Sequence, residues 1–572
     1  MKILLLTHSF NCLTQRFQLE LRRLGHQVTV EFDVNDAMSI DAVERFEPDL
    51  IVAPFLKRAI PEAIWRNYLC LIVHPGIKGD RGPSSIDWAI LNGETEWGVT
   101  LLQANEVMDG GDIWASQRFS MRPASKSSLY RGEVTEAAWR AMEQVLEQLP
   151  QPDFAPEPLD YNRDDVTGQW RCLMTQADRA IDWTRDDAAT IVTKIRSADG
   201  NPGLLSRVAG RECYLFNACA DFSLNYLIDG VSPGTPVAQR DGAIALASCD
   251  TVVWVSHLRL KPTETQPRTL KLPATRVLDT ESLSGLPELS VGLAVAEGYQ
   301  PIRARIDGKR AYLYFDFYNG AMGTDDCQQL CRAYRQLAGD PEIEMIVLMG
   351  GEDFWSNGIH LNLIEAADSP ADESWANINA IDDLTQAIIE TTDKLTVAVM
   401  RGNAGAGGVF MALAADRVLA RDGVILNPHY KGMGNLYGSE YWTYLLPRRV
   451  GTERAEQITG LRLPMGVAEA KQLGLIDQIL SAEQFETALE QQLLTLEQQS
   501  TRLLEQKRLQ RQADEHEKPL AEYRAEELER MKLNFYGFDP SYHVARYHFV
   551  YKLPKARTPP YLAPHRRVRQ QA

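Results

Sequence analysis

The chain has 572 residues, 44% of them hydrophobic and 24% charged, which is the balance of an ordinary globular protein with several domains. Its 60 Lys and Arg residues against 77 Asp and Glu residues give a formal net charge of −17, and an acidic surface repels phosphate backbones. We therefore expect no nucleic-acid partner. No apolar run approaches the ~20 residues that cross a bilayer, so we expect no membrane partner either.

The N-terminal segment and the eight cysteines indicate a cytoplasmic protein without a metal site. The apolar run in MKILLLTHSF is too short for a signal peptide. A long chain with few cysteines and no C-x-x-C motif is typical of reduced thiols. Cys327 and Cys331 share a predicted helix face, but no His or Cys partner lies at ligand spacing from them.

In chain order, four short apolar segments come first and predict a parallel sheet with crossover helices. They are KILLLTH, QVTVEFD, DLIVAPF and LCLIVH, and they predict a Rossmann-like domain over residues 1–150. A Pro-rich acidic stretch from Pro150 to Asp160 indicates a linker after this domain. Short alternating segments such as RECYLFNA and TVVWVSHLRL then predict a small OB-like β-barrel over residues 161–285.

A new αβ pattern begins at Ile302 and predicts a third domain over residues 300–500. Its apolar segments include AYLYFDF, EMIVLMGG and TVAVMRGNAGAGG. Residues 501–572 are expected to form a helical and extended tail, whose Pro-rich basic end from Lys552 is either a strap over the surface or a solvated end. The predicted fold class is thus α/β multidomain.

The first candidate site lies in residues 71–113. A buried strand brings His74 to its C-terminal end, and a Gly-rich turn presents Asp109, which together form a candidate acid/base pair. The ordered motifs HPG, RGPSS and MDGGDI resemble the active site of the glycinamide-ribonucleotide and methionyl-tRNA formyltransferases. The segment from about residue 180 to 278 resembles the C-terminal domain of the latter. The resemblance implies formyl-tetrahydrofolate as donor, His74 and Asp109 as catalytic residues, and Arg81 and Gly82 at the cofactor.

Other interpretations of these residues stay open. His74 could be a sheet-end histidine, Asp109 a turn residue, and Arg81 a loop anchor. The formyltransferases have an Asn two residues before the His, where this chain has Ile72. Losing one oxyanion donor costs ~10²–10³ in rate, which a strong nucleophile such as a thiolate can tolerate. The departure therefore favours a thiol acceptor.

The second candidate site lies in residues 302–500, which resemble the crotonase (enoyl-CoA hydratase/isomerase) family. That family holds a thioester carbonyl between two main-chain N–H groups, and the segments WSNGIHL and GNAGAGGVF match its two turns. The resemblance implies Ile359 and Gly407 as the N–H donors. It implies that coenzyme A is bound along Asn357, Gly358, His360, Leu361 and Gly405. Glycines permit such close approach, although tight helix–sheet packing would also explain them.

The two glutamates of the hydratases are replaced by Phe410 and Tyr430, so we do not expect alkene hydration. Tyr430 and Glu440 are the predicted acid/base groups, with Glu440 as base and Tyr430 as donor or orienter. The alternatives are a packed Tyr and a surface Glu.

The tandem of these halves resembles a family of hydrogenase maturation factors. The resemblance implies that a formyl group moves from formyl-tetrahydrofolate to coenzyme A, and that formyl-CoA is decarbonylated to CO for the active-site iron of a [NiFe] hydrogenase. It suggests the hydrogenase large subunit or its maturation complex as a partner. Three alternatives remain: a formyl-CoA-forming transferase or hydrolase that releases formate, a methionyl-tRNA formyltransferase with an appendage, and a non-catalytic scaffold. Acidic charge and Ile72 disfavour the second of them.

Overall fold

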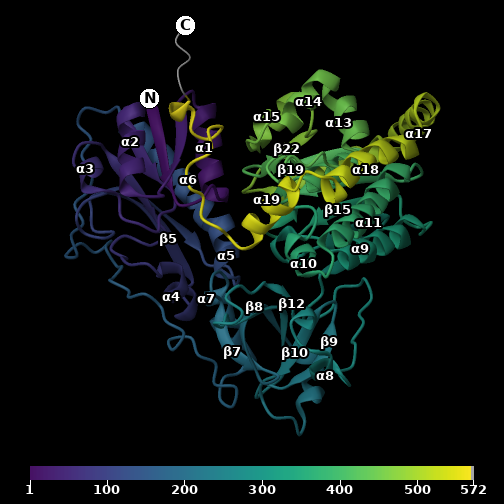
Figure 1. Ribbon diagram of the computed structural model, residues 1–572, viewed down its shortest axis with the longest axis horizontal. Coiled ribbons are helices and arrows are strands. Elements are labelled where there is room, and N and C mark those ends of the chain that lie inside the picture. The colour runs from purple at the N-terminus through teal and green to yellow at the C-terminus, as the bar shows by residue number, and fades with distance from the viewer. Residues whose placement is uncertain (568–572) are drawn as a thin grey trace. The chain divides into compact units, whose positions relative to one another are not determined.

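The computed structural model describes residues 1–567 and divides the chain into two compact units (Figure 1). The first unit contains Met1–Glu264, Pro273–Pro287 and the chain from Pro554 onward. The second unit contains Thr265–Leu272 and Glu288–Leu553. Both contain mixed sheets with helices, and the structure confirms the predicted α/β multidomain class.

A six-stranded sheet in the order β2-β1-β3-β4-β5-β6 forms the first part of the first unit. Its strands are β1 (Lys2–Thr7), β2 (Gln27–Phe32), β3 (Leu50–Ala53), β4 (Cys70–His74), β5 (Glu96–Gln103) and β6 (Ile113–Ser120). Its helical segments are α1 (Cys12–Arg23), α2 (Asp36–Phe46), α3 (Glu62–Trp65), α4 (Ser85–Leu91), α5 (Lys126–Leu129), η1 (Tyr130–Val134) and α6 (Thr135–Gln148). Strands β1 to β4 are parallel to one another, as their continuous apolar runs predict. Strand β5 runs antiparallel to both of its neighbours, β4 and β6.

Helices cover both faces of this sheet. Val43 of α2 and Ile64 of α3 pack with Leu4 and Ile51 in one core cluster. In α1 and α6, the rings of Phe17 and Trp139 meet edge to face with centroids 5.7 Å apart. Burial on both faces accounts for strands without polar alternation.

An antiparallel sheet in the order β7-β8-β11-β10-β9 forms the second part of the first unit. Its elements are α7 (Ala188–Ala198), β7 (Leu204–Val208), β8 (Arg211–Asp221), η2 (Phe222–Ile228), β9 (Pro236–Arg240), β10 (Ala243–Ala247), β11 (Val252–Leu260), β12 (Leu272–Pro273), η3 (Ala274–Arg276) and α8 (Thr280–Leu283). The short turns between its strands agree with the alternating sequence pattern.

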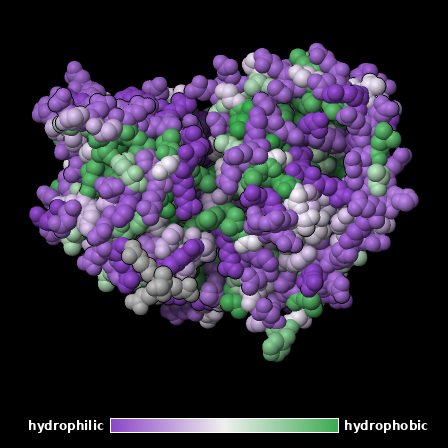
Figure 2. Space-filling view, turned by 90° about the horizontal axis from the view of Figure 1, so that it is seen from above, coloured by the Kyte–Doolittle hydropathy of each residue, from purple (hydrophilic) through white to green (hydrophobic). Residues whose placement is uncertain are grey.

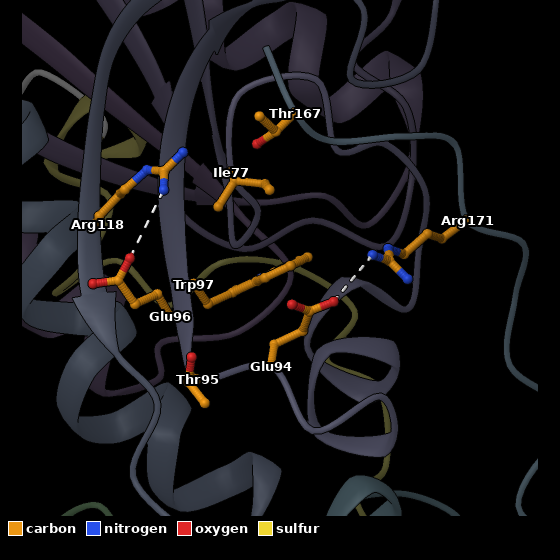
Figure 3. A pocket seen from close by; sticks show the side chains of 8 residues that line it. All are labelled: Ile77, Glu94, Thr95, Glu96, Trp97, Arg118, Thr167 and Arg171. Carbon is orange, nitrogen blue, oxygen red and sulfur yellow. Dashed lines mark ion pairs between the residues drawn. The ribbon is translucent and has the colours of Figure 1, made fainter. Parts of the chain in front are cut away.

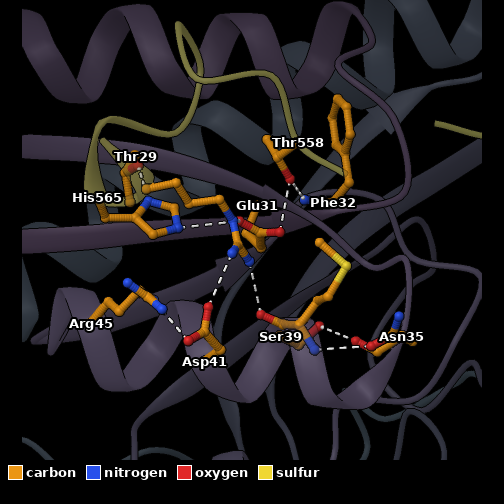
Figure 4. A network of polar contacts seen from close by, with 11 residues as sticks. Thr29, Glu31, Phe32, Asn35, Ser39, Asp41, Arg45, Thr558 and His565 are labelled. Carbon is orange, nitrogen blue, oxygen red and sulfur yellow. Dashed lines mark hydrogen bonds and ion pairs between the residues drawn. The ribbon is translucent and has the colours of Figure 1, made fainter. Parts of the chain in front are cut away.

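The chain end returns to the first unit and covers the edge strand β2 (Figure 4). The N–H of Val30 donates to the carbonyl of Leu562 at 3.0 Å. The buried carboxylate of Glu31 accepts from Thr558, His565 and Arg566, and η5 (Pro564–Arg566) supplies the last two. These hydrogen bonds outweigh the effect of burial and hold the pKa of Glu31 below its usual range. Residues 554–567 thus form a strap along β2, and the predicted tail beyond Arg567 lies outside the described residues.

The second unit contains two sheets, in the orders β13-β14-β15-β17-β19-β22 and β16-β18-β20-β21. Their strands are β13 (Ile302–Asp307), β14 (Arg310–Phe315), β15 (Met345–Gly350), β16 (Phe354–Ser356), β17 (Leu395–Met400), β18 (Asn403–Gly405), β19 (Arg417–Arg421), β20 (Ile425–Asn427), β21 (Met465–Gly466) and β22 (Gln478–Leu480). The pairs from β14 to β22 and from β16 to β20 are parallel. The short strands therefore end beside one another, where the second candidate site lies.

Helices pack on both faces of the larger sheet. They are η4 (Tyr318–Gly320), α9 (Thr324–Ala338), α10 (Leu361–Ala366), α11 (Pro370–Glu390), α12 (Gly407–Leu413), α13 (Trp442–Val450), α14 (Thr452–Gly460), α15 (Val467–Leu473), α16 (Phe485–Gln498), α17 (Ser500–Glu517), α18 (Leu520–Tyr536) and α19 (Ser541–Val550). The main core joins α9, α11, α12, α13 and α18, while Leu493 and Leu503 of α16 and α17 pack on the opposite face. The C-terminal helices are therefore part of this core.

The face drawn in Figure 2 is mostly hydrophilic, with hydrophobic residues in smaller patches. Among residues 1–567, every helix is too short or too polar to span a lipid bilayer. In the same residues, no three His, Cys, Asp or Glu side chains gather as a metal site.

Candidate functional sites

The first site centres on His74, the last residue of β4, which is 4% exposed. Its Nε2 lies 2.9 Å from Oδ2 of Asp80, a fully buried carboxylate that sequence reasoning did not single out. The guanidinium of Arg171 donates to the other oxygen of Asp80 at 3.1 Å. An Asp bonded to one ring nitrogen fixes the orientation of the imidazole and leaves the other nitrogen for chemistry.

The other nitrogen, Nδ1, lies 3.6 Å from Oδ2 of Asp109, so the structure brings the predicted pair together. Asp109 does not come from a neighbouring parallel strand, because β5 is antiparallel and its last residue Gln103 pairs with Leu71. The long loop 104–112 carries Asp109 to His74 instead. Asp109 adopts a left-handed conformation with φ 50°, and its carboxylate accepts from the N–H of Gly82 at 3.1 Å.

Two glycines are required for this geometry. A Cβ at Gly76 would lie 2.4 Å from Nε2 of His74 and 2.5 Å from Oδ2 of Asp80, between the two bonded atoms. A Cβ at Gly82 would lie 2.0 Å from the carbonyl oxygen of Arg171. The HPG and RGP motifs therefore serve close approach around the His–Asp pair.

Arg81 holds the site loop together. Its Nε donates to the carbonyl of Met108 at 2.9 Å, and its guanidinium lies over the ring of Trp170 with 5.4 Å to the centroid. The main chain of residue 81 also pairs with residues 169–171, from the segment after the predicted linker. The structure shows Arg81 in the loop-anchoring arrangement, and Ile72 lies half-buried in β4.

A polar cavity of about 340 Å³ lies beside this site (Figure 3). It is lined by Ile77, Glu94, Thr95, Glu96, Trp97, Arg118, Thr167 and Arg171. Arg171 links it to the first site through its bond to Asp80 and also lies 3.8 Å from Glu94. Neither His74 nor Asp109 lines the cavity, so we base the site on the His–carboxylate geometry and not on the cavity.

The second site begins where β16 and β18 end. Gly407 is the first residue of α12, so its N–H has no partner within the helix. A Cβ at Gly358, where φ is +76°, would lie 3.6 Å from the nitrogen of Gly407, which brings the turn before Ile359 beside this N–H. Ala406 has φ 47° and ψ −127°, a strained conformation typical of functional turns. The predicted pair of donors is therefore close together at the start of α12.

The residues predicted along coenzyme A lie around the same turn. Asn357 is exposed and donates to the carbonyl of Asn319 at 2.8 Å, and a Cβ at Gly405 would lie 3.1 Å from Oδ1 of Asn357. Leu361 begins α10 and is half-buried. His360 is buried, and its Nδ1 accepts from the N–H of Leu363 as the N-cap of α10. Burial lowers the pKa of His360 to about 4, so its ring is a neutral cap.

Tyr430 and Glu440 form a buried pair, with the Tyr430 hydroxyl 2.6 Å from Oε2 of Glu440. The ring of Tyr430 stacks on Phe410 at a centroid distance of 5.4 Å and an interplanar angle of 18°. The carboxyl of Glu440 lies against Gly407, because a Cβ there would be 1.9 Å from Oε1. The surface-Glu alternative is therefore wrong for Glu440, which is 1% exposed.

Asp382 of α11 is a buried carboxylate beside Glu440 that sequence reasoning did not single out. Its carboxylate accepts from the N–H of Glu440 at 2.8 Å and from the hydroxyl of Ser439 at 2.6 and 2.7 Å. Burial first, and then the charge of Asp382, raise the pKa of Glu440 to about 8. Burial raises the pKa of Asp382 as well, to about 6, while the hydroxyl of Ser439 and the cation of Arg524 oppose the rise.

Glu527 of α18 is a second missed residue. It is fully buried and accepts from the N–H groups of Tyr441 and Thr443 at 2.9 and 2.8 Å, which caps the start of α13. Burial raises its pKa well above the usual range. The sequence does contain a sign of both residues. Asp382 and Glu527 fall on the apolar face of their helices, where a carboxylate without a partner is costly, so each indicates a buried polar partner.

These arrangements support two kinds of chemistry. The first site offers an imidazole oriented by one carboxylate and facing a second, which suits proton transfer during acyl transfer. The second offers the main-chain N–H of Gly407 at the start of α12, beside a phenol and a carboxyl group of raised pKa, which suits proton transfer next to a bound carbonyl group.

Three family models match the chain in order. The Formyl transferase model matches residues 26–146, and the Formyl transferase C-terminal domain model matches residues 173–269. The Enoyl-CoA hydratase/isomerase model matches residues 319–539. A methionyl-tRNA formyltransferase from Roseiflexus sp. is 29% identical over 238 residues, which cover 39% of this chain and 70% of that protein.

Two relatives match nearly the whole chain. The crystal structure of HypX from Aquifex aeolicus in complex with tetrahydrofolic acid has a TM-score of 0.94 and 45% identity, and the match covers 100% of this chain and 99% of that one. The hydrogenase maturation factor HoxX from Bradyrhizobium diazoefficiens is 52% identical over 569 residues, which cover 99% of this chain and 97% of that protein. With both halves and their order shared over that length, the chain belongs to the HypX/HoxX family of hydrogenase maturation factors.

Proposed function

We propose that this protein moves a formyl group from formyl-tetrahydrofolate to coenzyme A and then releases CO from formyl-CoA for the iron of a [NiFe] hydrogenase. The observation that carries the proposal is the composition of the second site. A crotonase domain binds thioesters, yet both hydratase glutamate positions hold aromatic rings, and a single carboxyl, Glu440, is bonded to Tyr430. A formyl thioester has no α-carbon, so it does not need the lost glutamates.

In the first step, the thiol sulfur of coenzyme A attacks the formyl carbon, and the bond from that carbon to the folate nitrogen breaks. His74 takes the thiol proton and returns it to the folate nitrogen, while Asp109 at 3.6 Å stabilises the charged imidazole. Asp80 holds the ring in place. The tetrahydrofolic acid in the HypX structure from Aquifex aeolicus supports a folate as donor.

In the second step, the formyl proton leaves carbon, the carbon–sulfur pair leaves with sulfur, and the former C–H pair becomes the lone pair of CO. The products are CO and coenzyme A, and no electrons are needed from outside. The N–H groups of Ile359 and Gly407 would hold the carbonyl oxygen, and Asn357 to Leu361 would line the coenzyme. Glu440 is the base, because a carboxylate of raised pKa is stronger than an ordinary one, and Tyr430 donates or orients.

The test is incubation of the protein with formyl-tetrahydrofolate and coenzyme A, with CO, formate and formyl-CoA all assayed. CO with little formate supports the proposal. Formate without CO indicates a transferase or hydrolase, and unchanged coenzyme A indicates a scaffold. Calorimetry with coenzyme A then tests the binding site, since Asn357→Ala should weaken binding whereas His74→Ala should not.

The relative HoxX is a hydrogenase maturation factor, which suggests a hydrogenase as the acceptor of the CO. A hydrogenase large subunit, or a complex that matures it, would receive the gas from this protein. Co-purification with such a subunit, and its loss of CO ligand in cells with Glu440→Gln, would test the assignment.

A further inference from the structure

The main chain around Glu440 is strained and is held by side chains from elsewhere. Glu440 has φ 58° and Tyr441 has φ 59°, two consecutive left-handed residues that are not glycine. Such residues are strained and persist only where the surrounding structure determines them. Asp382 accepts from the N–H of Glu440 and twice from the hydroxyl of Ser439, so it fixes this turn from α11.

The hydroxyl of Tyr430 contacts two oxygen atoms of the turn that carries Glu440. It lies 2.6 Å from Oε2 of Glu440 and 2.9 Å from the carbonyl oxygen of Ser439. A phenol has a single proton to donate, and a carbonyl can only accept. The Tyr430 hydroxyl therefore faces two acceptors, Oε2 of Glu440 and the carbonyl of Ser439, which orient the phenol toward the Glu440 turn.

The ionisable surroundings of Glu440 are almost all acidic. They are Tyr430 before α13, Asp382 on α11, Glu527 on α18 and Cys327 on α9, with the cation of Arg524 on α18 nearer to Asp382 than to Glu440. Nε of Arg524 lies 4.0 Å from Oδ2 of Asp382, and its Nη1 is bonded to Asp383 at 2.7 Å. Arg524 thus favours a charged Asp382, and the charged Asp382 opposes a charge on Glu440.

We propose that Asp382 is a positioning residue for the second site, which holds Glu440 against Gly407 and Tyr430 and makes the Glu440 carboxylate a stronger base. This inference rests on the proposed function for its catalytic consequence. Asp382 contacts Glu440 through the main-chain N–H of Glu440 and through the hydroxyl of Ser439. A purely structural core residue would not change the pH at which Glu440 ionises, whereas the charge of Asp382 should.

The first measurement is the rate of CO release from supplied formyl-CoA as a function of pH. In the parent the rate rises as Glu440 ionises. Asp382→Asn keeps the shape of the side chain and one acceptor oxygen but removes the charge. The rising limb of the curve of CO release against pH should therefore move to lower pH by about one unit or more, and the maximal rate should be lower. Glu390→Gln, at an exposed position on the same helix, should leave the limb unchanged. A lower rate with an unmoved limb would overturn the proposal.

The second measurement does not need turnover. An infrared titration follows the C=O band of a protonated buried carboxyl, and the band absent from Glu440→Gln belongs to residue 440. Its midpoint should fall in Asp382→Asn. Asp382→Ser, which keeps a hydroxyl acceptor but also removes the charge, should lower the same Glu440 midpoint, so the coupling is tested even if Asp382→Asn does not fold.

The two failures are distinguishable. If the parent makes no CO but the midpoints shift as expected, the proposed function fails and the coupling of Asp382 to Glu440 remains. If the parent makes CO and neither midpoint shifts, the positioning role is wrong and the proposed function remains.

Discussion

Gly407→Ala should separate the two proposed steps. Its added Cβ would lie 1.9 Å from Oε1 and 2.2 Å from the carboxyl carbon of Glu440. Ordinary contact begins at 3.4 Å, so the carboxyl must move by about 1.5 Å, which is enough to break its 2.6 Å contact with Tyr430. Misplacement of a reacting group by ~1 Å can cost ~10²-fold in rate, so we expect CO release to fall by about that factor.

The assay supplies formyl-tetrahydrofolate and coenzyme A and measures formyl-CoA and CO in the same samples. Formyl-CoA should accumulate, because the first site is untouched. Gly432→Ala is the matched control, since a Cβ there meets nothing closer than Cε1 of His429 at 3.9 Å. Parental CO output from Gly407→Ala would refute the assignment of Glu440, and equal loss of formyl-CoA formation would refute the separation of the two steps.

Three further predictions concern the buried ionisable groups. His74→Ala should lower the rate of formyl-CoA formation by ~10²–10⁴-fold, whereas Asp80→Asn should lower the same rate by only ~10–10²-fold. Equal losses in the two variants would contradict the orienting role of Asp80. Glu440→Gln should stabilise the protein. The pKa of Glu440 is raised in the folded state, so between about pH 4.5 and about pH 8 the folded parent keeps a proton that the unfolded chain loses. The free energy of unfolding of the parent therefore decreases as pH rises through this range. The gain in the free energy of unfolding should reach ~1 kcal/mol or more by pH 8 in denaturant titrations, and a gain that does not grow with pH would contradict it. Deletion of the chain from residue 554 onward, which removes the strap of residues 554–567, should lower the melting temperature at neutral pH. The pKa of Glu31 is depressed, so the parent's advantage should shrink as pH falls through that pKa, and a pH-independent deficit would show that Glu31 is not its source.

The parallel strands at the start of the chain could be predicted because they depend on local patterns. Apolar runs of four to six residues gave the parallel strands β1 to β4, since buried strands need no polar alternation. The direction of β5 could not be obtained this way, because alternation is the same in parallel and antiparallel strands. Asp109 consequently reaches His74 by a different route from the one expected.

The candidate pairs that the structure brings together could be predicted only where one short segment carries both residues. His74 and Asp109 lie within a single motif-rich stretch, and Tyr430 and Glu440 lie ten residues apart. Their supporting groups come from distant segments: Arg171 follows the predicted linker, and Glu527 lies in the predicted tail. A sequence pattern does not show which distant carboxylate will meet which N–H, although a carboxylate on an apolar helix face marks the candidates.

On the proposed function, a thioester-binding fold could lose both of its glutamates and keep a use for a carboxyl. Phe410 and Tyr430, at the positions of those glutamates in the resemblance, form a buried stacked pair beside Glu440. A formyl thioester requires one proton to be taken from carbon and one to reach sulfur, so one base and one donor are sufficient. Glu440 approaches from a strained turn beside Gly407, and the burial and acidic neighbours that destabilise its charge also make it a stronger base. The cost in stability and the capacity for chemistry therefore have the same physical origin.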